Sequence, residues 1–216
     1  MGIIMNVITK IEVQKKNKDR VNIYINEDYA FSLSAELVYK EGLKVKQSID
    51  IDKIKKVALE DDYMKCKNSA LRIVEKNYKT KKEIIDKLTL KGYDENTINR
   101  TIEFLKEYNF INDENYARMY VNDKIKNHGA NKIKYDLIRK GISEDLIKNQ
   151  ISNIDENAER EVAYSLALKK YNLLIKREQD NYKLSQKLYR FLLSKGYSYD
   201  VTSEIVKKVT SNEEIY

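Results

Sequence analysis

Several residue types are scarce in this sequence, and each scarcity excludes a class of protein. The 216 residues include no proline, no tryptophan, one cysteine, one histidine and six glycines. A single cysteine, Cys66, excludes an intramolecular disulfide framework and fits a reducing cytoplasm. A single histidine, His128, excludes a His-based catalytic triad and a His-rich zinc site. We therefore expect a small buried or half-buried side chain at Cys66 and a structural role at a helix end for His128.

Phosphate-binding, metal-binding and membrane features are also missing. Six scattered glycines cannot form a Gly-x-x-x-x-Gly-Lys loop. The acidic groups Glu60–Asp62 and Asp113–Glu114 fit helix capping and solvation better than metal binding. No apolar run approaches the length of about 20 residues that a membrane helix needs, and the segment Gly2–Met5 is too short for a signal peptide. The expected protein is non-enzymatic and cytoplasmic, without cofactor, metal or membrane.

Positive charge is in excess. Lysine and arginine total 41 against 34 acidic residues, which gives a net charge of +7. Such a balance favours a polyanion or an acidic protein surface as the partner.

The first fifty residues have the periodicity of β-strands. Apolar residues alternate along Val7–Val13, along Val21–Ile25 and along Tyr29–Leu33, and Asn/Asp-containing turns separate these runs. Alternation bounded by such turns predicts a small three-stranded antiparallel sheet. A short helix is predicted to follow, with Ser34 as its N-cap and Gly42 as its end.

A four-residue motif recurs three times in the remainder of the chain. Lys-Gly-x-Asp/Ser occurs at Lys91–Asp94, Lys140–Ser143 and Lys195–Ser198. In each copy the glycine is predicted to end one helix with positive φ, and the Asp or Ser is predicted to cap the next helix. A period of about 50 residues indicates tandem helical repeats, which usually form binding surfaces. The predicted fold is mainly α, an elongated curved array of three three-helix repeats with a small N-terminal antiparallel β-sheet. The expected divisions are 1–51, 52–108, 109–154 and 155–216.

The three copies align on their glycines. Their second helices match at Ile84 and Leu88, at Ile133 and Leu137, and at Leu188 and Leu192. These pairs lie on one face of each helix and predict the repeat cores. First helices are expected to begin near Lys65, Asp113 and Asp155, and residues 172–181 are expected to form the longest link. Replacement of Gly141 with valine is expected to cost about 1–2 kcal/mol through left-handed strain.

Basic residues recur around the second helices, with tyrosines between them. Lysine and arginine neutralise phosphates, and aromatic rings stack on unpaired bases. For any single lysine, a solvated helix face is the better explanation; for the surface as a whole, both interpretations stay open. Charge reversal of Lys132, Arg139 and Lys140 together is expected to weaken DNA binding without unfolding, because all three are placed at or near exposed helix ends. The candidate nucleic-acid or partner-binding residues are Arg72, Lys81, Lys82, Arg118, Lys124, Lys126, Lys132, Arg139 and Lys140.

The motifs from about residue 52 to 210 resemble those of the RecX family of bacterial recombination regulators. The similarity is carried by Ala70–Arg72, Thr80–Ile84, Phe110–Ala117 and the block from Gly129 to Ile142. Thr80 stands where the family often has serine, and Ala130–Asn131 replaces a commonly basic pair. The N-terminal sheet resembles the extension of longer members.

This resemblance implies a non-enzymatic modulator that binds the RecA recombinase filament and lowers its ATPase, strand-exchange and coprotease activities, with a role in DNA repair and the SOS response. We expect a monomer that binds single-stranded DNA weakly and nonspecifically. Two alternatives stay open: a free-standing nonspecific DNA-binding protein, and an α-helical repeat adaptor without a DNA role.

Overall fold

The structure, a computed structural model, describes residues 6–15 and 17–211. It divides the chain into two compact units. The first comprises the chain up to Glu75 together with Lys87–Glu107, and the second comprises Lys76–Asp86 together with the chain from Tyr108 onward. Three strands and ten helices occur in the described residues, so the chain is mainly helical, as predicted. None of the described helices has the length and apolarity needed to cross a membrane.

The N-terminal module is the predicted three-stranded antiparallel sheet. Strands β1 (Ile8–Val13), β2 (Arg20–Ile25) and β3 (Asp28–Ser34) pair in the order β1-β2-β3. The β2–β3 turn places Asn26 and Glu27 at positive φ, as tight hairpins require.

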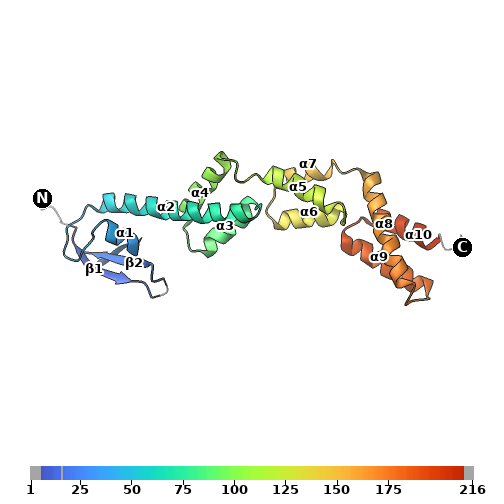
Figure 1. The fold of residues 1–216 in the computed structure, drawn as a ribbon, viewed down its shortest axis with the longest axis horizontal. Coiled ribbons are helices and arrows are strands. Elements are labelled where there is room, and N and C mark those ends of the chain that lie inside the picture. Colours follow the sequence, from blue (N-terminus) through green and yellow to red (C-terminus); the bar gives the residue numbers. More distant parts are fainter. Residues whose placement is uncertain (1–5, 16, 212–216) are drawn as a thin grey trace. The chain divides into compact units, whose positions relative to one another are not determined.

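Alternation along the strands buries one face of this sheet. The apolar side chains of β2, including Ile23, lie on the buried face with Leu37 of α1 (Ala35–Lys40) and Ile54 of α2 (Ile51–Lys76). Helix α1 lies beside the sheet in Figure 1. The Ser34 hydroxyl accepts a hydrogen bond from the Leu37 amide, which confirms the predicted N-cap.

Helix α2 is longer than predicted. It runs without a break for 26 residues, so the expected start of a helix near Lys65 is wrong. No glycine or proline interrupts Ile51–Lys76, and nothing in that segment ends a helix. Cys66 is fully buried on α2, and burial raises the pKa of its thiol. The prediction of a small buried side chain at this position is confirmed.

The three turns in which a glycine ends one helix before the next begins, here called glycine corners, share one backbone conformation. Gly92, Gly141 and Gly196 have φ values of 84°, 79° and 89°. At each corner, the amide after the glycine donates to the carbonyl five residues earlier, as in Tyr93 to Leu88 at 3.3 Å. This is the Schellman end of a helix, and the predicted left-handed glycines are confirmed.

Two of the three corners carry the predicted side-chain cap. Asp94 accepts from the Thr97 amide at 3.0 Å and Ser198 from the Val201 amide at 3.2 Å. Ser143 occupies the N-cap of its helix but makes no side-chain cap hydrogen bond, so the capping prediction is wrong at that corner.

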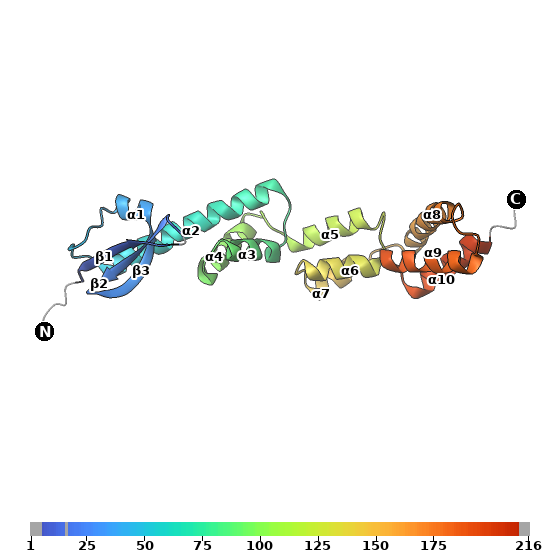
Figure 2. The ribbon, with the colours of Figure 1, turned by 90° about the horizontal axis from the view of Figure 1, so that it is seen from below.

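Helices group in threes along the chain. The first repeat ends with α3 (Lys81–Leu90) and α4 (Glu95–Glu107). The second repeat contains α5 (Asp113–Lys124), α6 (Ala130–Arg139) and α7 (Glu144–Ile151), and the third contains α8 (Glu156–Leu174), α9 (Asn181–Lys195) and α10 (Tyr199–Ser211). Figure 2 shows the second and third repeats as two helix groups.

Each of the last two repeats has its own core. Ile133 and Leu137 are buried in the second repeat, and Leu188 and Leu192 are buried in the third. These are the second-helix residues that the alignment on glycine predicts. The link before α9 is shorter than expected, because α8 continues to Leu174.

Second helices of successive repeats meet end to end within the second unit. The Thr80 hydroxyl, at the start of α3, donates to the Lys140 carbonyl at the end of α6 over 2.7 Å. In the same way, the Gly129 amide at the start of α6 donates to the Lys195 carbonyl at the end of α9 over 2.9 Å. The positive end of one helix dipole thus faces the negative end of the next. The corners at Gly141 and Gly196 therefore also act as docking points between repeats.

Candidate partner-binding surface

The nine proposed basic residues differ in exposure and are divided between the two units. Arg72 belongs to the first unit, and the other eight belong to the second. The exposed members are Arg72, Lys81, Lys82, Arg118, Lys126 and Arg139. The half-buried members are Lys124, Lys132 and Lys140.

Some of these cations already have an acidic partner on the surface. Lys82 pairs with Asp86 at 2.8 Å, and Lys124 pairs with Asp123 at 2.8 Å. Exposed pairs of this kind contribute little to stability, and a phosphate group can replace the carboxylate. Five exposed cations have no ion pair with the described residues: Arg72, Lys81, Arg118, Lys126 and Arg139. These five are the members most available to a partner.

The structure brings Lys124 and Lys140 together on a pair of tyrosines. Tyr116 and Tyr120, one turn apart on α5, stack with ring centroids 6.1 Å apart. The Lys140 Nζ lies 5.3 Å from the Tyr116 ring centroid and 5.8 Å from that of Tyr120, and the Lys124 Nζ lies 5.6 Å from that of Tyr120. Such cation–π contacts hold the two ammonium groups near α5.

Lys140 is held between two repeats. Its Nζ donates to Glu83 Oε1 of α3 at 2.8 Å, and both side chains are about one quarter exposed. Burial lowers the pKa of Lys140, but the hydrogen bonds to Glu83 and Tyr116 outweigh this effect and raise it above its ordinary value. Burial raises the pKa of Glu83, but the hydrogen bonds that its carboxylate accepts from Lys140 and Thr80 have the larger effect. The pKa of Glu83 therefore lies below its ordinary value. The ion pair therefore persists from below neutral pH, where Glu83 is already ionised, up to the raised pKa of Lys140.

The expectation that Lys132, Arg139 and Lys140 all lie at exposed helix ends is wrong for two of the three. Lys140 forms the ion pair with Glu83, and Lys132 is half-buried where the first turn of α6 meets the Gly196 corner. Only Arg139 is exposed. Reversal of all three charges would therefore disturb the junctions between repeats as well as any contact with DNA, and the two effects could not be separated.

Lys140→Glu is expected to destabilise the protein at neutral pH by about 1–3 kcal/mol, because it leaves Glu83 half-buried beside a like charge. Urea unfolding followed by circular dichroism measures the difference. Arg139→Glu is the matched control: it changes the neighbouring exposed residue and is expected to stay within about 0.5 kcal/mol of the parent. Equal effects of the two variants would contradict the structural role of Lys140.

Glu83 is the acidic partner of Lys140, and the pattern of basic residues in the sequence does not reveal it. Its signal in the sequence is the spacing Thr80-x-x-Glu83, a capping box in which Glu83 accepts from the Thr80 amide at 3.2 Å and Thr80 accepts from the Glu83 amide at 3.2 Å. The spacing identifies the start of a helix, but it does not show that Lys140 lies beside it.

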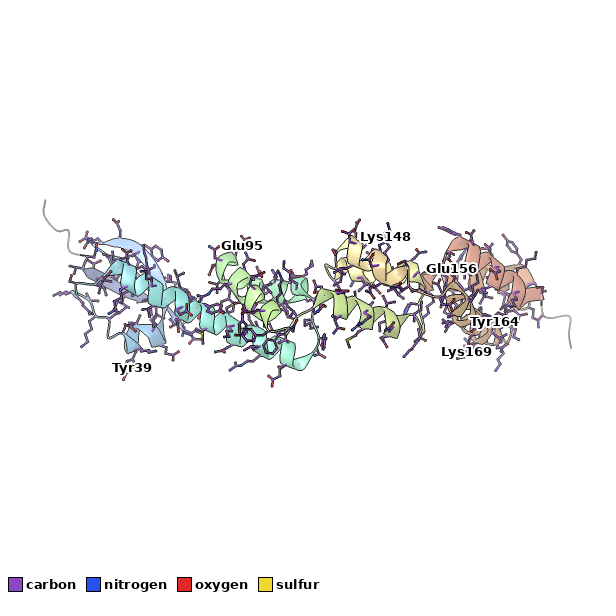
Figure 3. All side chains as sticks on the ribbon, turned by 90° about the horizontal axis from the view of Figure 1, so that it is seen from above. Tyr39, Glu95, Lys148, Glu156, Tyr164 and Lys169 are labelled. Atoms are coloured by element: carbon purple, nitrogen blue, oxygen red, sulfur yellow. The ribbon has the colours of Figure 1, made fainter. Side chains whose placement is uncertain are left out.

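Exposed aromatic and basic side chains occur in both units. Tyr78 and Tyr135 are more than half exposed, whereas Tyr93 hydrogen bonds to Ser69 and Tyr189 packs against the core of the third repeat. Lys148 of α7 and Lys169 of α8 point outward in Figure 3, and Tyr39 projects from α1.

His128 lies beside the junction of the second and third repeats. Burial, followed by the charges of Lys195, Lys132 and Lys124, lowers its pKa, so the imidazole is neutral at pH 7. Among the described residues, no group of three or more His, Cys, Asp and Glu side chains has the arrangement of a metal site.

Tandem three-helix repeats define an α-helical repeat protein, an architecture that usually forms binding surfaces. Family models match the chain in four successive parts: the regulatory protein RecX N-terminal domain at residues 6–50, and the first, second and third RecX three-helix domains at residues 66–105, 112–149 and 158–206. The chain belongs to the RecX family of regulatory proteins.

Known relatives match nearly the whole chain. The regulatory protein RecX of Clostridium perfringens strain SM101 is 58% identical over 97% of this chain and 99% of its own. That of Clostridium tetani is 46% identical over 95% of each chain. Among solved structures, one crystal structure of regulatory protein RecX has a TM-score of 0.65 with 26% identity, covering 97% of this chain and all of the other. RecX from Lactobacillus salivarius has a TM-score of 0.62 with 30% identity, covering 69% of this chain and 97% of the other.

Proposed function

We propose that this protein binds the filament that the RecA recombinase forms on single-stranded DNA and lowers its ATPase, strand-exchange and coprotease activities. The observation that carries the proposal is the match to all four RecX domains, in order, in a family of regulatory proteins. In this proposal the protein acts by binding and not by catalysis, as a monomer in the cytoplasm.

The exposed cations support a polyanionic or acidic partner. Arg118 and Arg139 lie in the second repeat and are exposed, as are Lys81 at the start of α3 and Lys126 after α5. Single cations on successive helices contact phosphates without reading bases, so naked single-stranded DNA should bind weakly, nonspecifically and with strong salt dependence. Three tandem repeats offer several such contacts to an ordered filament, where they act together.

The test is the rate of ATP hydrolysis by cognate RecA against added protein, at fixed and saturating DNA. We expect the rate to fall at ratios of protein to RecA at or below one, because one copy offers contact surfaces on successive repeats. Saturating DNA removes simple competition for the strand as a cause.

A flat rate would contradict the proposal, and a parallel DNA-binding measurement separates the alternatives. Salt-sensitive binding to naked DNA with a flat rate would leave a free-standing DNA-binding protein. Neither inhibition nor DNA binding would leave an α-helical adaptor.

A further inference from the structure

The three glycine corners are alike in conformation but not in occupancy. The Gly141 corner receives the first turn of α3, and the Gly196 corner receives the first turn of α6. A Cβ built on Gly141 would lie 2.5 Å from the Cβ of Lys82, and one built on Gly129 would lie 2.5 Å from the Gly196 carbonyl oxygen. Two corners are therefore closed by an incoming helix N-terminus.

The Gly92 corner is open. No atom lies within 4 Å of the position that a Cβ on Gly92 would occupy, although φ at Gly92 is 84°, as at the closed corners. Lys91–Asp94 instead line a groove of about 950 Å³ in the first unit, which Arg20, Tyr29 and Lys65 also line. The corner thus has the conformation of a docking point and free space in front of it.

We propose that the Gly92 corner binds the N-terminal turn of a helix supplied by a partner protein, in the way that the Gly141 corner binds the start of α3. This binding site is additional to the basic surface, and it does not depend on the proposed regulation of RecA.

The occupied Gly141 corner defines the chemistry of the partner helix. There, the hydroxyl of the helix N-cap, Thr80, donates to the corner carbonyl of Lys140, and Glu83 three residues later accepts from the Lys140 ammonium. Lys91 stands in the position of Lys140, one residue before the glycine, and is exposed. The expected partner therefore begins a helix with Ser/Thr-x-x-Glu, so that its hydroxyl bonds the Lys91 carbonyl and its glutamate pairs with the Lys91 ammonium.

The charges of the groove favour a helix N-terminus over a nucleic acid. Its lining contains four carboxylates against three cations. Arg20 pairs with Asp62 of the lining at 2.9 Å, and Lys65 pairs with Asp61 at 2.9 Å and with Glu36 of the lining at 3.7 Å. The carboxylates of Asp19 and Asp94 then remain against the single cation of Lys91. Carboxylates repel phosphate and attract the partial positive charge of a helix start.

A second copy of this chain is a poor occupant. Of the three second helices, α9, with Asp180 as its N-cap, is the one whose start makes no hydrogen bond to another repeat within the described residues. The Asp180 carboxylate already accepts from the amides of Tyr182 and Lys183. An ionised carboxylate cannot donate to the Lys91 carbonyl as the Thr80 hydroxyl donates at the Gly141 corner. The Asp180 amide, which corresponds to the Gly129 amide that donates at the Gly196 corner, already donates to Glu178 at 3.4 Å.

The test uses the full-length protein and a synthetic helical peptide. The peptide begins with Thr-Lys-Lys-Glu, the sequence of Thr80–Glu83, and continues with an alanine-rich helix. Amide NMR signals of Lys91–Asp94 should shift on addition of the peptide and reach saturation. Within the chain, short linkers hold a helix start near its corner at an effective concentration of about 1 mM. A contact that is formed under those conditions should bind a free peptide with a dissociation constant of about 1 mM or tighter. Signals at Gly141 and Gly196 should not shift, because those corners are occupied.

A charge exchange makes the test specific. Lys91→Glu should weaken binding at least tenfold, and a peptide with lysine in place of its glutamate should restore it. Lys87→Glu reverses an exposed charge on α3, the helix that ends at this corner, and Lys87 does not line the groove, so this variant should leave binding unchanged. The proposal is overturned if the amides of Lys91–Asp94 do not shift, if Lys91→Glu binds the original peptide as the parent does, or if Lys91→Glu abolishes a self-association seen by sedimentation.

Discussion

Gly141→Val is expected to lower the free energy of unfolding by about 2–5 kcal/mol, because two effects act at one position. The φ of 79° places any β-branched residue in the left-handed region. The new Cβ would also lie 2.5 Å from the Lys82 Cβ on α3, which disturbs the junction between the first two repeats. This exceeds the value expected from backbone strain alone. Urea unfolding followed by circular dichroism measures it.

Gly92→Val is the matched control for that prediction. Its backbone strain is the same, with φ of 84°, but no atom lies within 4 Å of the new Cβ. Its effect should be about 1–2 kcal/mol, the strain alone. If both substitutions lower stability equally, the contact between α3 and the Gly141 corner contributes nothing measurable.

Reversal of three exposed charges, Arg118→Glu, Lys126→Glu and Arg139→Glu together, is expected to weaken binding to single-stranded DNA by at least tenfold near physiological salt. This set is used in place of Lys132, Arg139 and Lys140, because Lys132 and Lys140 are half-buried at repeat junctions. Arg118, Lys126 and Arg139 are all exposed. If each contacts one phosphate, the slope of log K against log salt should fall by about 0.7 per contact, or about 2 in total. The measurement is DNA-binding affinity across a salt series, with the circular-dichroism spectrum of the variant unchanged.

A variant with the same change in net charge provides the control. Lys40→Glu, Lys44→Glu and Lys53→Glu reverse three exposed lysines in and beside the N-terminal module. This control should bind DNA more tightly than the first variant. If the two variants lose affinity equally, net charge alone governs binding and the second repeat carries no special surface.

Local patterns in the sequence are sufficient for most of the fold. Strand alternation predicts the three-stranded sheet, and Ser34 correctly marks the start of α1. The Lys-Gly phrase predicts three Schellman corners, because only glycine adopts positive φ without strain at the end of a helix. Spacing from each glycine predicts the buried second-helix residues. All these features depend on interactions within a few residues of the chain or on the period of one element.

Helix beginnings are harder to predict than the glycine corners. α2 continues through Lys65 because no residue there ends a helix, and its true start is capped by Asp50, whose side chain accepts from the Lys53 amide at 3.1 Å. Ser143 has the right residue type and position for a cap, yet its hydroxyl makes no cap hydrogen bond. Residue type specifies which capping bonds are available, and the side-chain conformation decides which of them form.

The sequence by itself determined the fold class, the repeat number and the glycine corners, since each depends on local spacing, and its motifs carry the resemblance to the RecX family. Only the tertiary structure decided which basic residues are available to a partner. Lys140 and Arg139 are neighbours in the sequence, but Lys140 pairs with Glu83 from another repeat while Arg139 is exposed. Tertiary structure likewise separates the open Gly92 corner from two closed corners of the same local conformation. Contacts between residues more than fifty positions apart make these distinctions, and no periodicity within one repeat encodes them.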